Sequence, residues 1–98
     1  MKPLIRFRVE ARLDIQEAYD WYEEHSQGIG DRFLAAVDQC IERVAANPRG
    51  FPTVYAEVRR ALLQRFPYSV LYSIEGEFIT VLGCFHGRRD PRTSEERR

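Results

Sequence analysis

The chain has 98 residues, of which 44% are hydrophobic and 31% are charged, and 15 cationic side chains balance 15 anionic ones. This length fits one domain, and the composition is that of a soluble globular protein. Zero net charge does not favour general binding to nucleic acid. Because no signal peptide and no apolar run of membrane-spanning length is present, we expect a cytoplasmic single domain at 1–92, followed by a charged tail at 93–98.

The first half of the sequence predicts one short strand and two helices. Apolar residues alternate over 4–9, which is the period of a strand. Residues 11–25 and 31–46 carry apolar side chains at helical spacing. Asn47-Pro48 ends the second helix, because the residue before a proline avoids the helical region. The short break at 26–30 predicts an antiparallel helix hairpin.

The second half predicts a loop over 47–53 and then three strands, over 58–64, 66–74 and 77–85. Glu75-Gly76 indicates a tight turn, so these strands should form an antiparallel meander. The order β-α-α-β-β-β therefore predicts an α+β two-layer fold, with the helix hairpin packed on a mostly antiparallel sheet. The partner of the first strand stays open.

The sheet should have one face covered by the helices and one that presents cations and aromatic rings. Strict alternation along the last strand gives two apolar sets, which are Ile79, Val81 and Phe85 on one face and Phe78, Leu82 and Cys84, followed by His86, on the other. Which of the two faces the helices cover stays open.

Cationic side chains gather near the ends of the predicted strands. Arg59 and Arg60 are neighbours on one strand, so at most one of them lies on a given surface. His86 could act as a general base, or it could order a turn through a backbone hydrogen bond. Arg88 and Arg89 follow it and could hold an anion between two guanidinium groups.

Aromatic residues have equally open assignments. Tyr68 and Tyr72 lie four apart on one strand and could stack on bases, or they could fill the core. Trp21 marks a contact patch if it lies off the buried stripe of its helix. Cys40 and Cys84 are 44 residues apart with no ligand cluster around them, so we expect two small buried side chains and no metal site.

The chain resembles the RelE/ParE superfamily of small toxins from bacterial type II toxin–antitoxin pairs, and the ParE or plasmid-stabilisation branch more than the RelE branch. The resemblance spans almost the whole chain through a succession of segments, namely Ala11-x-x-Asp14-Ile15-x-x-Ala18-x-x-Trp21-Tyr22, Phe33, Asn47-Pro48-x-x-Phe51-Pro52, Arg59-Arg60, Phe66-Pro67-Tyr68-x-Val70-x-Tyr72 and His86-x-Arg88-Arg89-x-Pro91.

This resemblance implies a toxin that is held silent by a cognate antitoxin, which packs on the helix hairpin and the sheet edge. We assign Trp21 and Tyr22 to that contact. ParE-like members poison DNA gyrase without a known enzymatic step, whereas RelE-like members cut messenger RNA on the ribosome. No cofactor is expected, and a homodimer and a toxin–antitoxin hetero-oligomer both stay open.

The residues of a nuclease are carried over by position. Arg59 or Arg60 matches the basic strand site and Arg88 matches the basic site after the last strand, so with His86 they form the catalytic set if the protein is a nuclease. Further anion or target contacts are assigned to Arg65, Tyr68, Tyr72 and Arg89.

Two departures from the nuclease pattern favour the ParE-like alternative. Ser69 stands where the nucleases carry an arginine between the two strand tyrosines, and no tyrosine follows Pro91. With fewer cations, a pentacovalent phosphate is harder to stabilise. The expected function is therefore growth inhibition by binding a target such as gyrase, with mRNA cleavage as the alternative.

Overall fold

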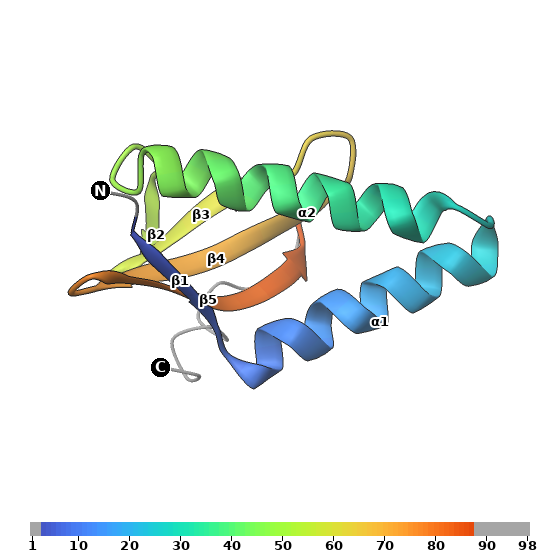
Figure 1. The fold of residues 1–98 in the computed structure, drawn as a ribbon, viewed down its shortest axis with the longest axis horizontal. Coiled ribbons are helices and arrows are strands. Elements are labelled where there is room, and N and C mark those ends of the chain that lie inside the picture. The colour runs from blue at the N-terminus through green and yellow to red at the C-terminus, as the bar shows by residue number, and fades with distance from the viewer. Residues whose placement is uncertain (1–2, 88–98) are drawn as a thin grey trace.

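The computed structural model describes residues 3–87, which form a helix hairpin packed on a five-stranded sheet (Figure 1). The elements in chain order are β1 (Leu4–Phe7), α1 (Val9–His25), α2 (Ile29–Ala46), β2 (Thr53–Tyr55), β3 (Val58–Leu62), β4 (Tyr68–Glu75) and β5 (Phe78–His86). The predicted α+β two-layer fold is confirmed. The short strand β2 was predicted as part of a loop, because three residues are too few to show a period.

The sheet has the strand order β1-β5-β4-β3-β2, and β2 to β5 pair antiparallel as a meander. β1 pairs parallel with β5, from Leu4 opposite Phe78 to Phe7 opposite Val81. The first strand, whose partner the sequence left open, therefore lies beside the last. β5 is an interior strand and β1 forms one edge of the sheet.

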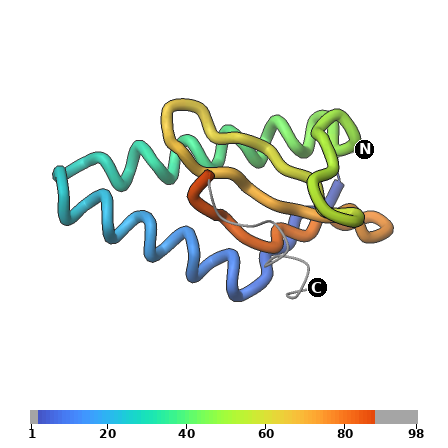
Figure 2. Tube along the Cα trace, turned by 180° about the vertical axis from the view of Figure 1, so that it is seen from behind, coloured from blue at the N-terminus to red at the C-terminus, as the bar shows by residue number. Residues whose placement is uncertain are grey.

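Both helices cover the same face of the sheet, and the view from behind shows the strands in front of α2 (Figure 2). The core between the layers joins α2 to three strands through the buried side chains Phe33, Val37, Cys40, Val44, Ala61, Val70, Tyr72, Ile79, Val81 and Cys84. A smaller buried cluster, with Val58, Leu71, Leu82 and Phe85, lies on the other face. Both Cys40 and Cys84 are buried, as predicted.

A β-bulge interrupts the pairing of β4 with β5. Leu71 lies opposite Gly83 and Tyr72 lies opposite Val81, so Leu82 and Gly83 together face one residue of β4. The extra residue reverses the alternation beyond Val81. The predicted grouping of β5 side chains is therefore wrong, because Cys84 joins Val81 on the helix-covered face and Phe85 joins Leu82 on the other.

The turn between the helices is held by one carboxylate. Glu23 Oε1 accepts hydrogen bonds from the backbone N–H groups of Gly28 and Gly30, at 3.0 and 2.8 Å. A Cβ atom on Gly30 would lie 2.5 Å from Glu23 Cγ and 2.8 Å from the Tyr19 ring. The close approach of α1 and α2 at this end therefore needs a residue without a side chain.

Neither helix in residues 3–87 has the length and apolarity that a membrane span requires.

Candidate protein-interaction groove

A groove of about 680 Å³ lies between α1 on one side and the first residue of β4 and the last residues of β5 on the other. Four residues that the sequence singled out line it together, namely Trp21, Tyr22, Tyr68 and His86. The rest of the lining consists of Asp14, Glu17, Ala18, Asp20, Glu24, Pro67, Cys84 and Phe85. It thus combines the residues assigned to antitoxin contact with a row of carboxylates.

A hydrogen bond between α1 and β5 lies at the end of the groove where Asp14 is located. β1 pairs with β5 only as far as Val81. Beyond that point Asp14 Oδ2, on α1, accepts a hydrogen bond of 3.0 Å from the backbone N–H of Cys84. α1 is therefore fixed to the edge of β5 at Asp14, and the groove lies along the following turns of the helix.

Trp21 lies at the rim of the groove with 52% of its surface exposed. Its ring stacks on the His25 imidazole with centroids 3.8 Å apart, and it meets the edge of Tyr22 at 5.1 Å. The His25 Nδ1 atom is in turn 2.7 Å from the carbonyl oxygen of Trp21. The exposed indole is thus held in place, as an interface anchor needs to be.

The groove has an aromatic floor beneath Trp21. Tyr22 and Tyr68 are half-buried with ring centroids 6.1 Å apart, and both pack on the buried ring of Phe33. Burial raises the pKa of Tyr22, with a smaller contribution from Tyr68. The Tyr68 ring meets His86 edge-on at 5.5 Å. These rings give the groove an apolar lining.

The charge of the groove is negative. Four carboxylates line it, those of Asp14, Glu17, Asp20 and Glu24, while none of the lining residues within 3–87 is lysine or arginine. Asp20 also accepts a 2.9 Å hydrogen bond from Gln16. Phosphate groups are repelled by such a surface, and cations are attracted.

The residues predicted to form a nuclease site are not brought together. Arg59 pairs with Tyr72 on the helix-covered face, and its Nη1 donates to the carbonyl oxygens of Phe51 at 2.6 Å and Arg49 at 3.1 Å. Arg60 pairs with Leu71 and points to the opposite face, as the alternation predicts.

His86 lies too far along the sheet from Arg59 and Arg60 to share a site with them. It pairs with Tyr68, which is four residues from Tyr72 along β4, or about 13 Å at strand spacing. Arg88 and Arg89 lie outside the described residues. The expected uncovered face with arginine and tyrosine side chains is therefore wrong for Arg59, Tyr68 and Tyr72, which lie on the helix-covered face.

Tyr72 needs a separate correction, because it was assigned to target binding. Its side chain is fully buried, and its hydroxyl donates a 2.6 Å hydrogen bond to the carbonyl oxygen of Pro48. Burial raises its pKa to about 12, against a smaller opposing effect of Arg59. Tyr72 is a core residue. Arg65 is exposed in the turn after β3, with a φ of 70°, and its binding role stays a prediction.

Comparison with known proteins identifies the family. Residues 5–91 match the family model described as the ParE toxin of the type II toxin–antitoxin system parDE. The chain belongs to this family. It is a type II toxin, as the resemblance implied.

Solved structures share the fold of this ParE-family toxin. One from the chromosomal ParDE system of P. aeruginosa is 25% identical with a TM-score of 0.67, over 87% of this chain and 96% of that one. A chain of the RelBE2 toxin–antitoxin complex of Mycobacterium tuberculosis is 21% identical with a TM-score of 0.62, over 88% and 99%. No curated protein matches the toxin.

From the sequence alone, no role was assigned to the carboxylates of the groove. Asp14, Glu17, Asp20 and Glu24 recur at spacings of three, three and four residues. This spacing keeps them on one side of a helix, the side that also carries Trp21. The shared side was the signal that could have found them.

The cysteines of the toxin are not placed for chemistry. Burial raises the pKa of Cys40 to about 11 and that of Cys84 to about 12, where the Asp14 charge adds to the effect. Both thiols are therefore protonated at neutral pH and are poor nucleophiles or ligands. Within residues 3–87, no three His, Cys, Asp or Glu side chains are grouped to hold a metal ion.

Proposed function

We propose that this ParE-family toxin acts by binding proteins and not by catalysis. A cognate antitoxin neutralises it through the groove at Trp21 and Tyr22, and its target is a protein such as DNA gyrase. The observation that supports this most is the separation of Arg59, Arg60 and His86, which leaves no common point at which a phosphate could meet them.

The separation of these residues argues against RNA cleavage because of what phosphoryl transfer requires. Cleavage of RNA needs donors that converge on the charge of the transition state, and removing one donor from such a site costs on the order of 10²–10³ in rate. The Arg59 guanidinium already donates to two backbone carbonyls. His86 lies in a groove whose carboxylates repel RNA.

The antitoxin contact is supported by the shape and chemistry of the groove. An exposed, fixed indole beside half-buried phenol rings is typical of a protein-binding hot spot. The ParDE and RelBE2 structures of similar fold belong to toxin–antitoxin systems. We therefore expect this toxin to form a hetero-oligomer with its antitoxin.

Two assays in parallel test the proposal. Purified toxin should inhibit DNA supercoiling by gyrase, and adding the antitoxin should restore it. Cells that express the toxin alone should stop growing with intact transcripts. Supercoiling that continues at micromolar toxin would contradict the gyrase target, and transcripts cut within coding regions would instead favour the RelE-like endonuclease.

A further inference from the structure

The acidic side of α1 limits the kind of antitoxin segment that the groove can bind. Glu17, Asp20 and Glu24 lie along three successive turns, and Glu17 and Glu24 are exposed. Asp14, at the head of the row, is bonded to the backbone of Cys84. The other three carboxylates thus extend along an open groove at a fixed helical spacing.

Apolar side chains are interleaved with these carboxylates. Leu13 and Trp21 are 61% and 52% exposed and lie at four-residue steps on either side of Glu17. Val9, one step earlier, is 70% exposed. Exposed leucine, valine and tryptophan on one side of a helix, with acidic residues between them, favour contact with a partner of matching pattern.

The sign of the charge excludes several partners. Nucleic acid and the headgroups of anionic lipids are repelled by Glu17, Asp20 and Glu24. A two-fold contact with a second copy through this side of α1 is also unfavourable, because it would bring the same carboxylates face to face. Like charges opposed across an interface are strongly unfavourable.

We propose that the groove takes a segment of the antitoxin in which arginine or lysine side chains alternate with apolar ones. The cations pair with Glu17, Asp20 and Glu24, and the apolar side chains pack against Trp21 and the half-buried Tyr68. This inference rests on the proposed function in taking the antitoxin as the partner, and it adds the chemistry by which the partner is selected.

The proposal can be tested by measuring the binding of two peptides to the full-length toxin through the fluorescence of Trp21. Trp21 is the single tryptophan of the chain. One probe is an amphipathic peptide of leucine and arginine, and the other has the same sequence with glutamate for arginine. The arginine peptide should shift the Trp21 emission and bind roughly tenfold more tightly than the glutamate peptide, with an advantage that shrinks as salt is added.

Paired variants separate groove charge from overall charge. The double variant Glu17→Gln/Glu24→Gln should weaken binding of the arginine peptide about fivefold, since exposed ion pairs each contribute modestly. The matched control Asp38→Asn/Glu42→Gln removes two exposed carboxylates from α2, outside the groove, and should leave binding unchanged. The purified antitoxin should displace the arginine peptide.

Three results would overturn the inference. Equal binding of both peptides would show that the groove does not select cations. Equal weakening by the two double variants would show that overall charge decides. A shift of Trp21 emission, without any peptide, on replacing the arginines of residues 88–98 with serine would make the chain itself the occupant.

The inference and the proposed function fail separately. A toxin that inhibits gyrase but does not discriminate between the peptides loses only the inference. If the toxin leaves gyrase active but the antitoxin displaces the arginine peptide from it, only the proposed gyrase target is contradicted.

Discussion

The Asp14 carboxylate on α1 accepts a hydrogen bond from the backbone N–H of Cys84 on β5, with Oδ2 and N 3.0 Å apart. The contact lies just past Phe7 and Val81, the last pair that joins β1 to β5. α1 therefore takes over from β1 along the edge of β5. A side chain supplies the acceptor that a longer β1 would have provided.

Replacing Asp14 should destabilise the toxin. Asp14→Ala leaves the Cys84 N–H without this acceptor in a partly buried place, which should lower the free energy of unfolding by about 1–3 kcal/mol. Asp14→Asn keeps a carbonyl acceptor and should lose less. Urea unfolding measures both, with the exposed Asp38→Ala as control, and equal midpoints for Asp14→Ala and Asp38→Ala would contradict the prediction.

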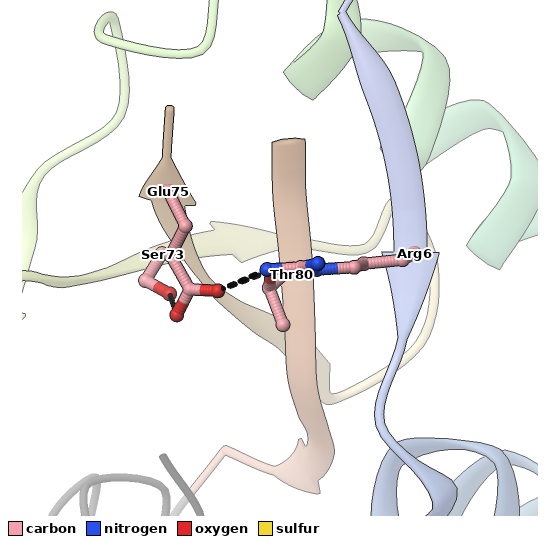
Figure 3. A network of polar contacts seen from close by, with 4 residues as sticks. All are labelled: Arg6, Ser73, Glu75 and Thr80. Atoms are coloured by element: carbon pink, nitrogen blue, oxygen red, sulfur yellow. Dashed lines mark hydrogen bonds and ion pairs between the residues drawn. The ribbon is translucent and has the colours of Figure 1, made fainter. Parts of the chain in front are cut away.

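A polar network on the sheet face away from the helices should make stability depend on pH. Arg6 donates to Glu75 at 2.7 Å and to Thr80 at 2.9 Å, and Thr80 and Ser73 also donate to Glu75 (Figure 3). These bonds, that from Arg6 foremost, hold the pKa of Glu75 below its ordinary value of 4.5.

Because the pKa of Glu75 is lower in the folded state, its contribution to stability is complete above pH 4.5 and is lost as the pH falls through the folded value. Both partners are partly exposed, so the contribution is about 1 kcal/mol at most. Wild type should exceed Glu75→Gln in stability at pH 7, and this advantage should shrink as the pH is lowered below 4.5. A constant difference across this range would contradict the assignment.

Gly30→Ala should loosen the helix hairpin. The new methyl group would lie 2.5 Å from Glu23 Cγ and 2.8 Å from the Tyr19 ring, so both side chains must move. We expect a loss of about 1–3 kcal/mol, as is usual for overpacking, through disturbance of the Glu23 bonds. Thermal unfolding is the measurement, and Gln39→Ala on the exposed side of α2 should change little.

Arg59 and Arg60 should behave differently, although they are neighbours. Arg59→Lys shortens the side chain by one atom, so its ammonium falls short of the Arg49 and Phe51 carbonyls that Nη1 reaches, and unfolding should become easier by about 1–2 kcal/mol. Arg60→Lys, on the other face, should stay within about 0.5 kcal/mol of wild type. In a nuclease both changes would instead abolish RNA cleavage in a protein of unchanged stability, which thermal unfolding and RNA integrity together would reveal.

Much of the fold follows from local patterns in the sequence. The α2 helix has strong apolar periodicity, and the prediction of 31–46 meets the observed Ile29–Ala46 to within two residues. Glu75-Gly76 turns as predicted, with Gly76 at a φ of 61°. The partner of β1 depends on contacts between residues 74 positions apart, as in Leu4 with Phe78, and no local pattern encodes it.

The candidate site was harder to predict, because one inserted residue changes which side chains share a face. The bulge at Leu82 and Gly83 moves Phe85 away from Ile79 and Val81. Tyrosine is common at binding sites, but the Tyr72 hydroxyl donates a hydrogen bond to the carbonyl oxygen of Pro48 inside the core. Only the three-dimensional arrangement distinguishes these cases.

The position of β5 in the middle of the sheet bears on how the toxin is made. β1 and β4 both pair with β5, so neither has its full set of partners until residues 78–86 have left the ribosome. We expect the growing polypeptide to stay incompletely folded until β5 has been made. A partner that recognises the folded sheet therefore cannot bind until β5 has been made.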